Sequence, residues 1–462
     1  MVFILLPPVI IFILSFFKIN KFFMATVASM VLIPVIYIMF NPFVNSYFYV
    51  DKLNSYILLI SSIVGIVVGL SGISMPQRLK LSENAIKRFY RFFGIFWLGV
   101  NISILSNNMG LYWIGLEFAT LSTVYMIKVK NSPFANREAW KYLIVGAIAI
   151  SLILFGIILM YASAKPVLGE KAMDFYSLVT NAKQINGYLF EIGFLIAVTG
   201  MFIKMGFFPM NLWLSDIERS AIYPVGALFS GVLESAIILG FFRLSQIEMA
   251  INYTHLIAFV YIYAIFTLFM VSFLIYRSKD FIRLFSLSGI EHMTLIALFW
   301  VSGGYFAALL HFGAHALFKP ALFLSVGILE QKRKYMFKGA LSGFKKPIIP
   351  IIISLLLLGV ISLPPSPMFF SEIYGFKAMI DISKHMNYFL TMIFAVFIIL
   401  LLISLIFYKF VTVYQEGLYE EKDAKKIVYK SEIIILAIFI ISLIALLLPQ
   451  TFSYIEGIMS WD

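Results

Sequence analysis

Long apolar runs, separated by short polar or charged segments, cover nearly the whole chain. A membrane-spanning helix needs about 20 mostly apolar residues, and reading the runs between their polar boundaries gives a series of candidate spans. The fourteen predicted helices, numbered 1 to 14, cover residues 2–17, 22–40, 53–75, 89–106, 110–127, 139–162, 188–214, 222–243, 254–276, 281–302, 304–329, 347–380, 387–414 and 432–450. The pattern predicts an all-α polytopic membrane protein with a single transmembrane domain over residues 1–462.

The composition narrows the class of protein further. Hydrophobic residues make up 62% of the chain and charged residues 13%, against about 25% charged in soluble domains, which excludes a soluble enzyme or a disordered scaffold. The net charge of +12 is spread over short loops, so it argues against a nucleic-acid partner. The chain has no cysteine, and therefore no iron–sulfur cluster or thiolate zinc site. We expect no cofactor in this chain, and any redox chemistry would belong to a partner.

Basic residues are distributed unequally between the two sides of the predicted bundle. Of the 35 Lys and Arg residues, 26 follow odd-numbered helices and 7 lie on the opposite side. Because basic loops stay in the cytoplasm, both termini are predicted to be extracytoplasmic, in the plasma membrane. The first apolar run has no basic segment before it and no small-residue cleavage site before Lys18, so it is predicted to be a helix rather than a signal peptide.

Prolines interrupt two helices that are longer than the bilayer requires. Helix 7 contains Pro209, and helix 12 contains three prolines within residues 364–367. Each proline leaves a carbonyl without its helical partner, and in a membrane such a break usually borders a hydrated cavity. Helices 7 and 12 are predicted to run in opposite directions, five helices apart, as in inverted repeats. The repeats would be helices 4–8 (89–243) and helices 9–13 (281–414, with helix 9 at 254–276); ordinary proline kinks are the alternative.

Five charged residues are predicted to lie near the bilayer centre. They are Glu117 in helix 5, Lys204 in helix 7, Glu234 in helix 8, Lys319 in helix 11 and Glu372 in helix 12. A charge at the bilayer centre costs roughly 2.5–3.5 kcal/mol on insertion scales, so each is a functional candidate. Ion pairs that only lock helices together are the alternative interpretation.

Histidines add a proton-transfer pattern to these charges. His311, His315 and Lys319 are spaced four residues apart, which places them on one stripe of helix 11 at steps of about 6 Å. Imidazole normally titrates near neutrality, so the stripe favours a proton path over ordinary core histidines. Glu291 and His292 form a further pair in helix 10. A metal site at the two stripe histidines is disfavoured because no carboxylate or thiolate joins them on the stripe.

Five segments, taken in their order along the chain, carry a resemblance to a known family: Trp113–Glu117, Lys204–Asp216, Lys279–Met293, His311–Lys319 and Phe369–Glu372. Together they resemble the antiporter-like, proton-translocating membrane subunits of respiratory complex I, multisubunit cation/proton antiporters and energy-converting membrane-bound hydrogenases. A further segment, Glu138–Leu143, is most similar to the hydrogenase branch.

The resemblance implies roles for the buried residues. Glu117 and Lys204 would form the charged pair of a first half-channel, Lys319 and Glu372 would carry protons through a second, and the stripe histidines would connect the two. It also implies partners: other membrane subunits of a multisubunit complex and a peripheral redox arm. The transported ion would be the proton, with Na⁺ as the alternative.

The chain departs from the family pattern at two places. The family has a lysine or histidine on helix 8, whereas the spacing to Arg243 gives Ser235 here, with Glu234 immediately before it. The segment after helix 7 keeps Asp216 but lacks the family's histidine. We include Glu234 and His292 in the predicted proton pathway.

The leading functional interpretation is a proton-translocating membrane subunit of a redox-driven oxidoreductase complex, of the membrane-bound hydrogenase or complex I type. Protons would move through two half-channels linked by buried Glu, Lys and His, and the chain would have no catalytic or metal-binding residues of its own. The alternative is a subunit of a multisubunit Na⁺/H⁺ antiporter. A single-chain solute carrier would not explain the histidine–lysine stripe. A structural subunit that has lost pumping would explain the altered helix 8.

Overall fold

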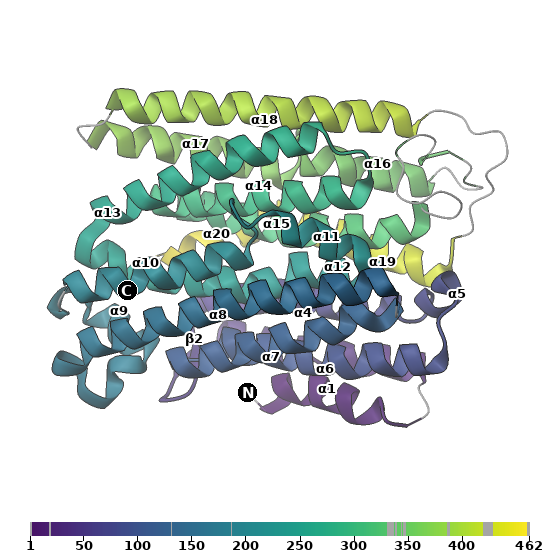
Figure 1. The fold of residues 1–462 in the computed structure, drawn as a ribbon, viewed down its shortest axis with the longest axis horizontal. Helices are drawn as coiled ribbons and strands as arrows, with labels where there is room; N and C mark the ends of the chain where they lie inside the picture. The colour runs from purple at the N-terminus through teal and green to yellow at the C-terminus, as the bar shows by residue number, and fades with distance from the viewer. Residues whose placement is uncertain are drawn as a thin grey trace.

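The structure is a bundle of helices that lie side by side, with most axes along the long direction of the molecule (Figure 1). A computed structural model describes the chain except residues 1, 18–19, 131, 186, 330–336, 338–339, 343, 345–347, 386–388, 419–427 and 460–462. The α-helices are α1 Val2–Leu14, α2 Lys21–Ser29, α3 Leu32–Phe40, α4 Lys52–Ser71, α5 Met75–Leu79, α6 Glu83–Leu105, α7 Met109–Ile127, α8 Pro133–Leu168, α9 Phe175–Thr180, α10 Gly187–Lys204, α11 Leu212–Ser220, α12 Tyr223–Leu228, α13 Glu234–Tyr276, α14 Phe281–Val301, α15 Tyr305–Leu329, α16 Ile348–Val360, α17 Pro367–His385, α18 Phe389–Gly417, α19 Lys430–Ala445 and α20 Pro449–Met459.

Short elements connect these helices. The 3₁₀-helices are η1 Lys128–Lys130, η2 Gly169–Met173 and η3 Ala182–Gln184, and η4 Phe229–Leu233 is a π-helix. The strands β1 Phe43–Val44 and β2 Tyr49–Val50 form an antiparallel hairpin in which Phe43 pairs with Val50.

The helical, polytopic architecture is confirmed. Every predicted span has a helical counterpart among the described residues; positions 347 and 387–388, at the edges of predicted helices 12 and 13, lie outside them. Within the described part, nine helices are long and apolar enough to cross a membrane, or ten if the bent pair α19–α20 forms one span. The total of fourteen therefore stays a prediction. The stretch 244–253, expected to be a loop, is helical because α13 continues through it.

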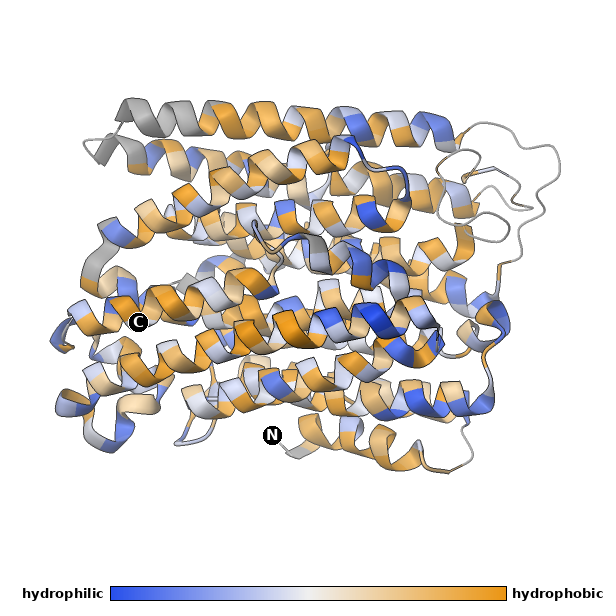
Figure 2. Ribbon diagram, viewed as in Figure 1, coloured by the Kyte–Doolittle hydropathy of each residue, from blue (hydrophilic) through white to orange (hydrophobic). Residues whose placement is uncertain are grey.

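Burial divides the bundle into a core and a periphery. The most apolar stretches of Tyr223–Ile251, α14 and α15 are completely buried inside the protein, whereas that of Ile398–Gly417 is 28% buried. The ribbons of the outer helices are coloured mostly as hydrophobic residues in Figure 2. An apolar surface of this kind is suited to contact with lipid. The three core segments carry the predicted pathway histidines, Glu234 and Lys319.

Several helices begin where a polar side chain caps the first turn. Asp51 caps α4 by accepting from the amide of Asn54, and Asp280 caps α14 by accepting from the amide of Arg283, both at 2.9 Å. Ser132 does the same for α8. Because the first amides of a helix have no helical partner, these residues fix where each helix starts.

The two proline-containing helices are broken in the structure. Helix α10 ends at Lys204 and α11 begins at Leu212, while α16 ends at Val360 and α17 begins at Pro367. Gly206 in the first break has φ +77°, a conformation that favours glycine. The breaks predicted for helices 7 and 12 are therefore present.

The packing of α8 against α10 depends on close backbone contact. A Cβ added at Gly193 would lie 2.7 Å from the carbonyl oxygen of Gly156 and 2.9 Å from the amide nitrogen of Met160. Small residues let membrane helices approach this closely, so that van der Waals contact can replace the hydrophobic effect as the source of helix association.

We expect Gly193→Leu to separate α8 from α10 and lower the stability of the purified protein by about 2 kcal/mol. Removing a helical glycine gains less, about 0.5–1 kcal/mol, so the clash decides the sign. Thermal unfolding in detergent, followed by tryptophan fluorescence, measures the change. Ile158→Val on the exposed face of α8 is the control and should leave the unfolding temperature unchanged. An unchanged Gly193→Leu variant would contradict the close packing.

Candidate functional site

A carboxylate and a histidine connect two core helices. Glu234 is the first residue of α13, directly after the π-helical turn η4, and its Oε2 lies 2.8 Å from Nε2 of His315 on α15. Both side chains are buried. The hydroxyl of Ser235 instead donates to the carbonyl oxygen of Gly231 within the turn, at 2.7 Å. Glu234, and not Ser235, therefore joins this helix to the histidine stripe.

A second hydrogen-bonded series crosses three helices. Nδ1 of His292 on α14 lies 3.1 Å from Nε2 of His311 on α15, and Nδ1 of His311 lies 2.8 Å from the hydroxyl of Ser371 on α17. A neutral imidazole has one donor and one acceptor nitrogen, so such a series can pass a proton by exchanging the two roles. The rings of His292 and His315 are 5.7 Å apart, which places the two series next to each other.

Lys319 is fully buried one turn beyond His315 on α15. Its ammonium donates to the carbonyl oxygen of Phe285 at 3.0 Å and to the hydroxyl of Ser288, both on α14. In the described structure no direct hydrogen bond joins His311, His315 and Lys319 to one another. Each is bonded to a different part of the surrounding helices, so transfer along the stripe would go through those partners or through water.

Glu372 lies at the second helix break. It accepts a hydrogen bond from Ser362 in the segment between α16 and α17. A cavity of about 10 Å³ is lined by Glu372, Glu291, His292 and Ser288, together with apolar residues. That volume is about one water molecule, and the lining offers the polar partners that a buried water needs. Glu372, His292 and Ser288 therefore line one cavity, and Ser288 also accepts a hydrogen bond from Lys319.

Glu117 and Lys204 do not form a direct ion pair. The buried ammonium of Lys204 donates to the hydroxyl of Thr120, one turn after Glu117 on α7, and lies 5.7 Å from the ring centre of Tyr142. Glu117 is half-buried, and its Oε2 has no hydrogen-bond partner among the described residues. The Thr120 hydroxyl that accepts from Lys204 donates in turn to the carbonyl oxygen of Leu116, so Lys204 lies near Glu117 without a described hydrogen bond that joins them.

Sequence reasoning left several buried carboxylates out of the pathway, among them Glu291 and Glu218. Glu291 lies with one oxygen 3.5 Å from Nε2 of His292, and its position next to that histidine was the available signal. Glu218 on α11 is 3% exposed and has one carboxylate oxygen without a hydrogen-bond partner in the described structure. Because the nearby Asp216 and Arg219 are charged, the sequence predicted an exposed loop here and gave no sign that Glu218 is buried.

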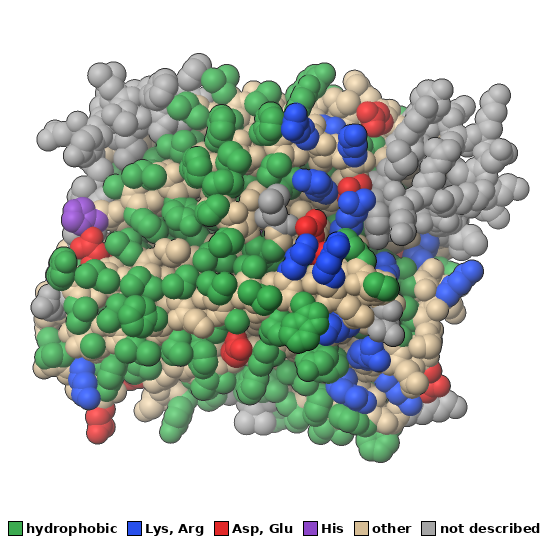
Figure 3. All heavy atoms as spheres, in the orientation of Figure 1, with side chains coloured by type: hydrophobic (Ala, Val, Ile, Leu, Met, Phe, Trp, Pro, Cys, Tyr) green, Lys and Arg blue, Asp and Glu red, His purple; other side chains and the backbone are tan. Residues whose placement is uncertain are grey.

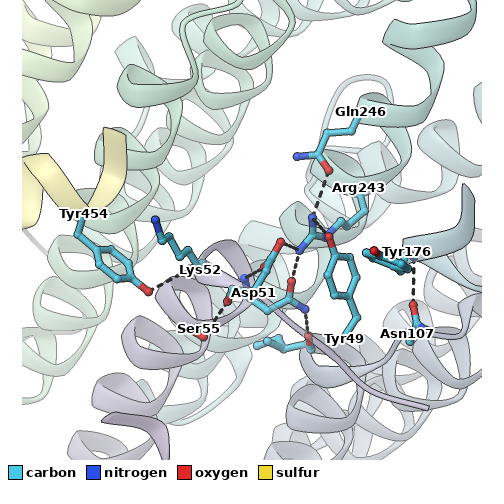
Figure 4. Close-up of polar contacts among 11 residues, drawn as sticks. Tyr49, Asp51, Lys52, Ser55, Asn107, Tyr176, Arg243, Gln246 and Tyr454 are labelled. Atoms are coloured by element: carbon cyan, nitrogen blue, oxygen red, sulfur yellow. Dashed lines mark hydrogen bonds and ion pairs between the residues drawn. The ribbon is translucent and has the colours of Figure 1, made fainter. Parts of the chain in front are cut away.

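A polar cluster around Arg243 was also missed (Figure 4). Its side chain is 3% exposed and donates to the carboxylate of Asp51 and to Asn54, which cap and begin α4. It also donates to Gln246 at 3.3 Å and lies 4.3 Å from the ring centre of Tyr49. This cluster ties the end of the core segment Tyr223–Ile251 to the β-hairpin.

The cluster extends to other connecting segments. Burial raises the pKa of the Tyr49 phenol to about 12, with the guanidinium of Arg243 opposing the shift, so this phenol stays protonated at neutral pH. Its ring lies 5.6 Å from that of Tyr176, whose amide donates to the side chain of Asn107. On the other side, Tyr454 donates to the carbonyl oxygen of Lys52 at 3.3 Å (Figure 4). Segments far apart in the sequence meet at this end of the bundle.

The fold and these contacts define a class of protein: a polytopic membrane protein whose innermost helices hold a chain of hydrogen-bonded ionisable groups. Within the described residues, no group of three or more His, Cys, Asp or Glu side chains is placed to hold a metal ion. The chain belongs to the NADH:quinone oxidoreductase/Mrp antiporter transmembrane family, whose model matches residues 106–400.

Individual relatives agree with this membership. A hydrogenase-4 component F homolog from Methylacidiphilum infernorum (isolate V4) is 31% identical over 341 residues, which are 71% of each protein. NADH-quinone oxidoreductase subunit N 1 from Aquifex aeolicus (strain VF5) is 26% identical over 285 residues, which are 60% of this chain and 58% of that protein. A chain of the membrane-bound sulfane sulfur reductase, an archaeal respiratory membrane complex, has the same fold with a TM-score of 0.85, covering 98% of this chain and 95% of that chain at 16% identity.

We expect Asp51→Asn to lower stability by about 2 kcal/mol, because it leaves the buried guanidinium of Arg243 without its counter-ion. The loss is less than that of a fully buried pair, since the Asp51 side chain is 31% exposed. Thermal unfolding of the purified protein measures it. Glu83→Gln, which removes an exposed ion pair with Lys87, is the control and should change stability by less than about 0.5 kcal/mol. Adding Arg243→Met to Asp51→Asn should recover part of the loss; equal effects of Asp51→Asn and the control would contradict the role of the pair.

Proposed function

We propose that this chain is a proton-translocating, antiporter-like membrane subunit of a redox-driven complex, of the membrane-bound hydrogenase or complex I type. One observation carries the proposal: ionisable groups of the completely buried core segments are joined by hydrogen bonds, from Glu234 to His315 and from His292 through His311 to Ser371. Titratable groups are expensive to bury in a membrane, and proton relay is the use that explains a connected series of them.

The proposed path has two halves and a centre. Glu117 and Lys204 would form the first half, with Lys204 bonded to Thr120, one turn after Glu117 on α7. Glu234 takes the place of the expected helix 8 lysine, because it already contacts His315. This contact supports pumping over a structural subunit that has lost its relay.

The second half continues from the histidines to the break in helix 12. His292 and His311 exchange hydrogen-bond roles, Lys319 shares Ser288 with the small cavity, and Glu372 lines the opposite wall of that cavity. One water in the cavity would complete the connection. Glu372 would then be the exit group towards the extracytoplasmic side.

The partners would be other membrane subunits and a peripheral redox arm. The chain has no cysteine for iron–sulfur ligation, so electron transfer would take place in that arm and reach this chain as a conformational or electrostatic signal. The relative named hydrogenase-4 component F homolog favours the hydrogenase branch. The alternative is a subunit of a multisubunit Na⁺/H⁺ antiporter, which the family description also includes.

The finer architecture supports two inverted repeats. The broken helices α10–α11 and α16–α17 place a non-helical segment beside Lys204 in one half and beside Glu372 in the other. Equivalent breaks next to equivalent charges are what a duplicated and inverted unit of five helices would produce. We propose helices 4–8 and 9–13, within a total of fourteen, as these units.

The orientation can be tested with single cysteines, because the chain has none of its own. Lys and Arg side chains gather towards one end of the helices in Figure 3, the end we propose to be cytoplasmic. We expect Ser82→Cys to be shielded from an impermeant maleimide in intact cells and Gln184→Cys, in an exposed part of the opposite end, to be labelled. Labelling of the first and not the second would reject extracytoplasmic termini.

Replacing Lys319 by Arg tests the relay. Guanidinium keeps the charge but does not release its proton at accessible pH, so a relay lysine cannot be replaced in this way. We expect proton uptake by inside-out vesicles containing the complex to fall by at least about tenfold, with H₂, formate or NADH supplied in turn as electron donor and a pH-sensitive dye as readout. Lys279→Arg, outside the core helices, is the matched control and should pump normally.

Full pumping by Lys319→Arg would reject the relay role of this lysine. Na⁺-driven proton movement in the same vesicles without any electron donor would favour the antiporter alternative.

A further inference from the structure

We propose that Glu218 is a proton-uptake residue that delivers protons from the cytoplasmic face to Lys319. The inference rests on the proposed function and adds an entry point to it. Glu218 belongs to α11, the short helix that follows the first break, so it comes from the first half of the chain while Lys319 comes from the second.

Exposure falls steeply along α11 towards Glu218. The side chains of Asp216 and Arg219 are 49% and 47% exposed, and Arg219 lies 3.9 Å from Asp280 at the start of α14. Glu218 itself is 3% exposed. The helix therefore reaches the surface at the basic end of the bundle with two of its charged residues and turns the third inward. Glu218 is therefore buried, although the next residue in the chain, Arg219, is in contact with solvent.

The inward-facing carboxylate is incompletely satisfied. Oε2 of Glu218 and the hydroxyl oxygen of Ser286 on α14 are both buried and have no hydrogen-bond partner among the described residues. Helix α11 packs against α14, and Ser286 and the charges of Glu234 and Lys319 all act on the Glu218 carboxylate. A buried, unpartnered carboxylate oxygen is costly unless it is protonated or hydrated, so its retention indicates a use that requires both protonation states.

Ser286 belongs to the same turn of α14 that binds Lys319. Ser286 lies between Phe285 and Ser288, and these two residues accept the hydrogen bonds of the Lys319 ammonium. Helices α11 and α14 pack against each other, as do α14 and α15. Glu218 thus belongs to one helix packed against α14 and Lys319 to another, and their charges act on each other.

The transfer involves one proton and no other reactant. Glu218 takes a proton from water at the cytoplasmic face and becomes a neutral carboxylic acid. It donates to the oxygen of Ser286, whose own hydroxyl proton passes on, directly or through one water, to the neutral amine of Lys319. The products are the Glu218 carboxylate and the Lys319 ammonium, and Ser286 regains its original state. Onward transfer from Lys319 resets the amine for the next proton.

The competing interpretation is that Glu218 only stabilises the packing of α11 on α14. The comparison of Glu218→Gln with Glu218→Asp separates the two. Glutamine keeps the size and polarity of the side chain but carries no titratable proton, whereas aspartate keeps the proton on a side chain that is one methylene shorter. A packing role would tolerate glutamine better than aspartate; a proton-uptake role requires the reverse.

We would measure proton uptake per electron transferred in inside-out vesicles that contain the whole complex, using a pH-sensitive dye and H₂, formate or NADH as electron donor. Glu218→Gln should lower this ratio by at least about tenfold, and Glu218→Asp should restore most of it. Blue native gels check that both variants assemble. Glu83→Gln, an exposed carboxylate at the same end of the bundle, is the control and should match the unmodified protein.

Normal pumping by Glu218→Gln overturns the proposal, and so does equal impairment of both variants or a greater loss with aspartate. Lys319→Arg in the same preparation separates this failure from that of the proposed function. If Lys319→Arg is impaired and Glu218→Gln is not, the chain pumps protons by another entry. If both pump normally, the proposed relay itself is wrong.

Discussion

A charge inside a membrane protein needs a partner, and this requirement determines how the core of the bundle is arranged. Lys319 is completely buried, and its ammonium is held by a backbone carbonyl and a hydroxyl of α14. Glu234 is held by His315. Because each group is satisfied by a different helix, the core helices are held in register by the same contacts that would carry protons. If the proposed relay operates, stability and transport depend on one set of hydrogen bonds.

The long helix α13 connects two polar regions with different characters. Glu234 at its start belongs to the proposed relay, and Arg243, nine residues later and about 13 Å along the axis, belongs to the cluster at the hairpin. The relay groups can change charge, whereas the guanidinium of Arg243 stays positive at any accessible pH. Because this charge is fixed and paired with Asp51, the Arg243 cluster holds α13 against the connecting segments at its end of the bundle.

Apolar periodicity predicted the helical architecture and both broken helices, because span length and proline have direct steric consequences. The number of spans was less certain, since several helices are short or carry charges and only their neighbours decide whether they cross. For the site, residue type was enough to identify Lys319 and the stripe histidines. Local sequence could not identify Glu218, because the rotation of α11 turns this residue inward while the nearby Asp216 and Arg219 stay about half-exposed. It could not identify the contact of Arg243 with Asp51 either, because the two residues are 192 positions apart. The π-helical turn before Glu234 contains a single glycine, Gly231, and one glycine does not distinguish it from ordinary helix.

The complete burial of α14 and α15 has a consequence for biosynthesis. These helices contain the ionisable residues of the proposed relay, and they are less apolar than outer segments such as Pro133–Met173. A nascent segment with a lysine and two histidines leaves the translocation channel for lipid at a penalty that an all-apolar segment does not face. The outer helices would be released first, and the relay helices would wait beside them until their hydrogen-bond partners had been synthesised.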